Sequence, residues 1–336
     1  MMRDLLQQTP SLGNALWFFL AAVVLLVILL GFVTYAIYFE RKVIGWMQAR
    51  IGPNRVGPLG LLQTVADVAK LLIKEDTRPK HADKALYALA PILAYAPAFA
   101  VLAVLPFTET LQFADLGIGI LYYIALSGIT VLGVITAGWA SNNKYSLIGG
   151  LRSAAQMISY EVPLVMSVVG VVLMTGSMNL REIVLAQQDM WNFIPQFLGF
   201  AVFLVAAQAE LNRTPFDLPE AESELVGGYH VEYSGFRFAM FMLAEYVYMF
   251  GMGAMVTILF FGGWLPIHPA LSFIPGIVWF AVKLLLYVFL QFWLRATMPR
   301  PRVDQLMSFA WKVLLPVALL NILITAVVIS YQSGMI

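Results

Sequence analysis

Apolar runs of roughly 20 residues recur along this 336-residue chain and constrain its fold more than any other feature. Hydrophobic residues make up 61% of the sequence and charged residues 12%, with a mean hydropathy of +0.82, which is typical of an integral membrane protein. We therefore expect an all-α membrane protein with one polytopic domain over 1–336. The runs predict eight transmembrane helices, at about 15–38, 84–105, 117–140, 155–176, 193–210, 237–262, 272–296 and 309–332. The first run has no small-residue cleavage site, so we interpret it as a retained helix and not as a signal peptide.

The basic residues are biased toward four of the connecting loops. Of the 20 Lys and Arg residues, 17 lie in or beside the loops that follow the first, third, fifth and seventh expected helices. Arg3 and Arg181 lie on the other side, and Lys283 lies within a span. Loops rich in Lys and Arg face the cytoplasm. Since the number of helices is even, both termini are expected on the outside.

The loop after the fifth helix begins an unusually acidic stretch, over 210–246. Its carboxylates are Glu210, Asp217, Glu220, Glu222, Glu224, Glu232 and Glu245. Carboxylates packed this closely repel one another, so some are expected to titrate near neutral pH. Groups that titrate near neutral pH at a membrane boundary suit a proton relay.

Three glutamates are expected at similar depth in the cytoplasmic half of three spans. Glu161 lies nine residues beyond Arg152, and Glu245 eight residues beyond Arg237, which is roughly 12–13 Å along a helix. Glu210 lies at the inner end of the fifth helix. A charged carboxylate facing lipid is unfavourable, so each should face the bundle interior. The simpler alternative is a protonated glutamate that only links helices; three of them beside an acidic loop favour a proton path.

Lys283 is the one basic residue within an expected span, twelve residues before Arg295. It either forms an internal ion pair with one of the carboxylates or extends its ammonium toward the membrane surface. We favour the ion pair and include Lys283 among the proton-path candidates.

The first cytoplasmic loop contains a short amphipathic segment. Glycines and prolines between 52 and 60 break any helix before Leu61. Beyond them Gln63, Asp67, Lys70 and Lys74 recur at helical spacing, with apolar residues between them. This pattern predicts a surface helix along the cytoplasmic side of the membrane. It is either a simple interfacial anchor or, as the stiff Gly-Pro run suggests, part of a fixed structure that faces another protein.

Several chemistries are excluded by what the sequence lacks. There is no cysteine, and His81, His230 and His268 are not spaced as ligand pairs, so haem and iron–sulfur clusters are not expected on this chain alone. No phosphate-binding loop, GxGxxG, HExxH or GxSxG motif is present, which argues against nucleotide-binding and hydrolytic chemistry. We expect no metal site and no nucleic-acid partner.

Four long strings carry a resemblance to a known family. They are ERKVIGWMQARIGPNRVGPLGLLQTVADVAKLLIKE, GWASNNKYSLIGGLRSAAQMISYE, AELNRTPFDLPEAESELVGGYHVEYSG and RPRVDQLMSFAWK. The chain resembles, over nearly its whole length, the H-subunit family of bacterial NADH:quinone oxidoreductase, which is subunit 1 in mitochondrial respiratory complex I. The resemblance implies that the chain forms the membrane side of a quinone chamber beneath a peripheral arm. It also implies the start of a carboxylate path that couples quinone reduction to proton translocation.

The resemblance also assigns roles to individual residues. The acids that match the family's proton path, together with the arginine among them, are Glu161, Glu210, Arg213, Asp217, Glu220, Glu222, Glu224 and Glu245. The residues that match positions around the quinone chamber are Glu40, Arg41, Arg50, Asp67 and Arg295.

The implied substrate is a quinone, either ubiquinone or menaquinone, with no cofactor bound by this chain alone. The implied partners are peripheral quinone-site and iron–sulfur subunits, neighbouring small membrane subunits and membrane lipid, in a bacterial plasma membrane and not in the mitochondrial inner membrane. The membrane anchor of an energy-converting hydrogenase shares this architecture, although GPNRVGPLGLLQ and NRTPFDLPEAESELV match the quinone enzymes more closely. A stand-alone transporter is the remaining alternative, but no inverted repeat is evident.

Overall fold

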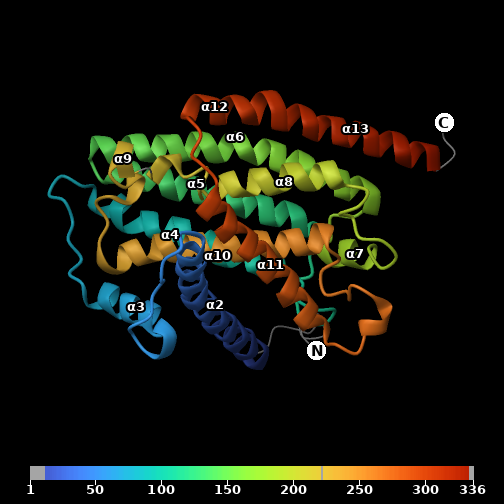
Figure 1. The fold of residues 1–336 in the computed structure, drawn as a ribbon, viewed down its shortest axis with the longest axis horizontal. Coiled ribbons are helices and arrows are strands. Elements are labelled where there is room, and N and C mark those ends of the chain that lie inside the picture. The colour runs from blue at the N-terminus through green and yellow to red at the C-terminus, as the bar shows by residue number, and fades with distance from the viewer. Residues whose placement is uncertain (1–11, 221, 333–336) are drawn as a thin grey trace.

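The computed structural model describes residues 12–220 and 222–332, and these residues form helices and connecting loops without strands (Figure 1). Within these ranges, seven helices are long and apolar enough to cross a membrane. They are α2 (Leu12–Met47), α4 (Lys84–Ala100, continued by Val101–Val104), α5 (Gly119–Ala140), α6 (Lys144–Thr175), α10 (Gly235–Phe260), α11 (Gly276–Thr297) and the continuous rod of α12 (Val303–Phe309), a π-helical turn (Ala310–Leu314) and α13 (Leu315–Gln332). The all-α membrane fold is thereby confirmed.

The fifth expected span is present as a shorter apolar helix. This helix, α8 (Phe197–Glu210), has 14 residues and is about 21 Å long, less than the thickness of a typical hydrocarbon core. The remaining helices are α3 (Gln63–Ile73), α7 (Leu180–Leu185) and α9 (Glu222–Leu225). Helix α3 is the expected amphipathic segment, and the 3-10 turn Pro58–Gly60 precedes it.

Two helices extend beyond their apolar runs. Helix α6 begins at Lys144 instead of 155, because the side chain of Asn143 accepts a hydrogen bond from the Tyr145 N–H and caps it. Helix α2 continues to Met47, so Glu40 and Arg41 are helical. Hydropathy misses such polar end turns, since it records where the apolar run stops and not where the helix stops.

Helix α10 is the centre of the bundle. Its most apolar window is 83% buried, against 17% for α2 and 22% for α12–α13, so α10 packs on all sides while the other two lie at the periphery. It contacts α4, α11, α3, α7, α2 and α8. Helices α2 and α11 lie side by side, tilted against the main bundle (Figure 1).

The four basic loops meet at one end of the bundle, near α9 in Figure 1. The Asp83 N–H donates to the Ala140 carbonyl and joins the first loop to the second. Asn143 donates to Glu232, joining the second loop to the third. The third loop is joined to the fourth where Arg300 donates to Asp217. This common end is what the loop-charge pattern predicts.

Candidate functional site

Glu40 of α2 is the centre of a buried ion cluster. Its side chain is 4% exposed and accepts from Arg213 Nη1 at 3.0 Å and from the Tyr246 hydroxyl at 2.6 Å. Arg295 of α11 pairs with its other oxygen. Arg213 lies in the loop after α8, and Tyr246 belongs to α10. A buried carboxylate needs such partners, since an unpaired charge in this environment is strongly unfavourable.

Arg213 connects Glu40 to Glu245. Its Nε lies 2.8 Å from Glu245 Oε1, an ion pair that is not well aligned as a hydrogen bond, and its guanidinium lies 4.3 Å from the ring centroid of Tyr246. Burial alone would lower the pKa of Arg213, but the adjacent carboxylates Glu40 and Glu245 raise this pKa well above its usual value. Arg213 is therefore a permanent cation between two acids.

A polar cavity separates Glu245 from Glu210. It has a volume of about 60 Å³ and is lined by both glutamates together with Tyr248, Tyr229 and Asn212, among other residues. A cavity of this size with several polar groups holds a few water molecules. The two glutamates, which come from α10 and from the end of α8, therefore face the same polar space inside the bundle.

Glu161 completes this row from the side of α5. Its Oε1 lies 3.4 Å from where a Cβ on Gly128 would be, so the absent side chain of Gly128 leaves room for the carboxylate. Glu210 contacts Ser127, the preceding residue of α5, and interacts electrostatically with Glu161. All three predicted intramembrane glutamates thus face the bundle interior.

The acidic loop is not one cluster of like charges, and this expectation requires correction. Asp217 is bound by Arg300 at 2.6 Å and by the Thr214 hydroxyl at 3.0 Å. Glu224 pairs with Arg152 at 2.7 Å. Arginines from other loops therefore compensate acids that appear adjacent only in sequence. The predicted side chains of Glu220 and Glu222 lie outside the described residues.

The residues predicted around the quinone chamber fall into two groups. Glu40 and Arg295 belong to the buried cluster. Arg41 points elsewhere, because successive helical residues differ by about 100° in direction, and it pairs with Asp67 of α3 at 2.6 Å on the surface. Arg50 is exposed and donates to Gln48.

Lys283 does not form the expected ion pair with a carboxylate of the described residues. Its ammonium donates to the carbonyls of Phe261, Gly263 and Leu265 at 2.7, 3.0 and 2.6 Å, and it lies 4.6 Å from the Trp191 ring centroid. The turn after α10 exposes carbonyls that need donors, and three of them use all three ammonium hydrogens. Lys283 therefore closes the end of α10 opposite the acidic loop.

An apolar groove lies between α2 and α11. Its volume is about 420 Å³, and its lining includes Tyr35, Ala36 and Val43 from α2, with Phe289 and Phe292 from α11. Glu40 follows Ala36 by four residues, and Arg295 follows Phe292 by three, so each ionic residue continues a groove-lining face of its helix. The groove therefore leads toward the buried ion cluster.

Three further residues were not found from the sequence. Tyr246 and Tyr248 contact the glutamates but look like ordinary apolar-helix residues in EYVY, and Arg300 appears only as surface charge. The alternation of Tyr246 and Tyr248 directly after Glu245 was the available signal for the two tyrosines.

Comparisons with known proteins agree on one family. The family model described as NADH dehydrogenase matches residues 20–326. The H subunit of NADH-quinone oxidoreductase from Brevibacillus brevis is 85% identical over 100% of both chains. The proteins of the same name from Anoxybacillus flavithermus and Bacillus thuringiensis are 68% and 66% identical, over 98% of each chain. The chain therefore belongs to the NADH dehydrogenase family of membrane subunits.

Proposed function

We propose that this chain, as a membrane subunit of NADH-quinone oxidoreductase, forms the membrane-side wall of the quinone-reducing site and carries protons away from it. The observation that supports this most is the position of Arg213. It joins Glu40, beside the apolar groove, to Glu245, beside the polar cavity. The hydrogenase anchor and the transporter are set aside, because the matching family and the relatives above bear quinone oxidoreductase names.

The groove between α2 and α11 fits an isoprenoid tail. Its lining is almost entirely apolar, and its aromatic residues Tyr35, Phe39 and Phe289 are each about half exposed. A tail in this groove directs the polar quinone head toward Glu40 and Arg295, where charged groups are available. An apolar lining with a few convergent polar groups is typical of small-molecule sites.

Electrons reach this site from a partner. Quinone reduction takes two electrons and two protons and yields a quinol, and a chain with no cysteine and three separated histidines offers no ligand set for an electron-carrying cluster. We propose that a peripheral iron–sulfur subunit docks at the end where the four basic loops meet. This end faces the cytoplasm, which places both termini outside.

Charge coupling links the redox step to the carboxylates. A negative charge that forms about 10 Å from a carboxylate changes the free energy of its ionisation by about 1.7 kcal/mol at an effective dielectric constant of about 20. That is enough to move a proton between groups of similar affinity. In the proposed route the proton passes from Glu245 through the cavity to Glu210 and on to Glu161.

The test uses Glu161→Gln and Glu245→Gln in the assembled complex in membrane vesicles. Glutamine keeps the shape and a hydrogen-bonding group but does not titrate, so assembly should persist while NADH-driven proton translocation and quinone reduction both fall. Glu109→Gln is the matched control, because Glu109 is exposed at the opposite end and pairs only loosely with Arg181, at 3.5 Å. Wild-type translocation in both path variants would contradict the proposal.

A further inference from the structure

Several buried polar atoms near Glu210 have no hydrogen-bond partner among the described residues. They are Glu210 Oε2, Tyr123 Oη of α5, Tyr248 Oη of α10, and Tyr287 Oη and Gln291 Oε1 of α11. None of these residues is more than 6% exposed. In folded proteins most such atoms bind a protein group or an ordered water, because a buried polar atom without a partner is destabilising. Five in one region therefore call for a common explanation.

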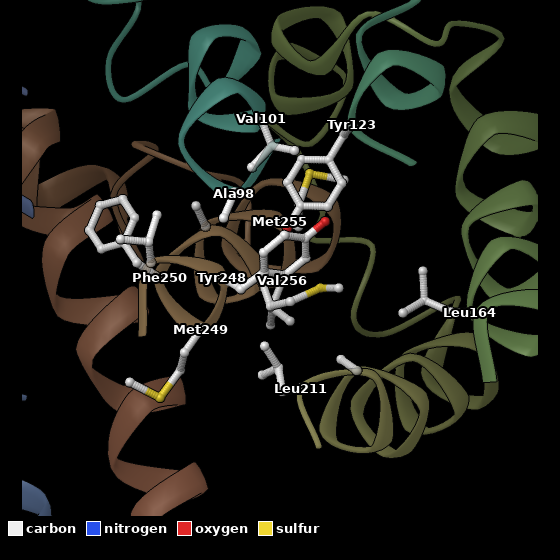
Figure 2. Close-up of a cluster of buried hydrophobic side chains, with 14 of the residues drawn as sticks. Ala98, Val101, Tyr123, Leu164, Leu211, Tyr248, Met249, Phe250, Met255 and Val256 are labelled. Carbon is white, nitrogen blue, oxygen red and sulfur yellow. The ribbon is translucent and has the colours of Figure 1, made fainter. Parts of the chain in front are cut away.

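These atoms belong to one connected group. Tyr123 interacts electrostatically with Tyr248, Glu210 and Tyr287. Figure 2 shows the rings of Tyr123 and Tyr248 lying against each other, with their hydroxyl groups directed into the same space between α5 and α10. Gln291 lies beside the Tyr287 hydroxyl, although the two do not form a well-aligned hydrogen bond.

Helix α11 connects this group to the ion cluster. Tyr287, Gln291 and Arg295 are spaced four residues apart and therefore share one helix face. The stripe is about 12 Å long. It begins at Arg295, which pairs with Glu40, and ends at Tyr287, which interacts with Glu210. Polar groups of α11 thus extend from the ion cluster toward Glu210 without involving Arg213.

Glycines of α10 make room for the tyrosines. A Cβ on Gly251 would lie 3.1 Å from Tyr123 Oη, and a Cβ on Gly253 would lie 2.9 Å from Tyr287 Cδ1. The two aromatic rings therefore lie directly on the α10 backbone. Larger residues at these positions would displace the rings and close the space around the hydroxyl groups.

We propose that Tyr123, Tyr248, Tyr287 and Gln291 bind a chain of internal waters that forms a second proton route between the Glu40–Arg295 pair and Glu210. Internal waters use about three hydrogen bonds each and satisfy groups of this kind. Each water or hydroxyl in the chain accepts one proton on one side and releases one on the other, so one proton moves and no electrons are transferred. This inference rests on the proposed function, because Glu210 is the common acceptor of both routes.

The test combines a high-resolution cryo-EM map of the assembled complex with proton translocation in vesicles. We expect ordered waters within hydrogen-bond distance of the Tyr123 and Tyr287 hydroxyls. Tyr287→Phe keeps the ring and removes only the hydroxyl, so assembly should persist while translocation falls about tenfold, equivalent to about 1.4 kcal/mol on the barrier. Tyr122→Phe is the control, since Tyr122 is adjacent to Tyr123 but donates to the Ala100 carbonyl.

Each other outcome overturns the inference. A map without these waters means that the site is dry, and then Tyr287→Phe should raise thermal stability by removing an unpaired hydroxyl. Waters with unchanged translocation in Tyr287→Phe would make them structural only. Failure of the proposed function appears separately, as wild-type translocation in Glu210→Gln; in that case the second route is overturned together with it.

Discussion

Replacing Arg213 with methionine should strongly destabilise the membrane domain. The Arg213 side chain is 1% exposed and that of Glu40 is 4% exposed, so the change removes one partner of a fully buried ion pair. Breaking such a pair lowers the free energy of unfolding by about 3–5 kcal/mol. The same substitution at Arg302, whose pair with Asp304 is 79% and 68% exposed, should lower it by about 1 kcal/mol or less.

The two variants are compared by titrating the purified complex in mild detergent with a denaturing detergent. A double-mutant cycle of Arg213→Met with Glu40→Gln should give a coupling free energy of about 1–3 kcal/mol, because the two side chains are in direct contact. If Arg213→Met were no more destabilising than Arg302→Met, or if the cycle were additive, Arg213 would not hold the cluster together.

Three further predictions follow from single residues. Burial lowers the pKa of His230 to about 4, although nearby Glu245 raises it; the unfolded chain, with a pKa near 6.5, then binds the extra proton, so stability is full above about pH 6.5 and falls by up to about 3 kcal/mol as pH drops to 4. His230→Gln should flatten this melting-temperature profile, and the same steep profile in the variant would contradict the assignment. Lys283→Met leaves three carbonyls without their donor, so assembled complex should decrease while turnover per assembled complex stays normal; lost turnover would return Lys283 to the proton path. Gly31→Leu adds a side chain to open space in the groove and should raise the KM for quinone several-fold, whereas Gly117→Leu, in similarly open space outside the groove, should leave it unchanged.

The sequence was sufficient to predict the depth and direction of the intramembrane glutamates. Helical rise placed Glu161 and Glu245 at similar depth, and the unfavourable energy of a charge in lipid predicted that they face inward. Both conclusions depend only on local geometry and solvation. The same is true of the amphipathic helix α3, whose charge spacing alone indicates a surface position.

The pairing of charges depends on tertiary packing and was not predictable. Glu40 and Arg213 are 173 residues apart and meet only because α2, α10 and the loop after α8 converge. The acidic loop appeared self-repelling because Arg152 and Arg300, which compensate it, come from other loops. Lys283 was assigned a carboxylate partner because carbonyl acceptors in a turn leave no signature in the sequence.

The most direct test of the carboxylate path is redox-induced infrared difference spectroscopy of the assembled complex. If reduction of the quinone changes the protonation of Glu210 and Glu245, the spectrum contains a carboxylic acid C=O band that shifts in D₂O. We predict that this band is lost or reduced in Glu210→Gln and Glu245→Gln and is unchanged in the control Glu109→Gln. An identical carboxylic acid band in the wild type and in both path variants would contradict the proposed path.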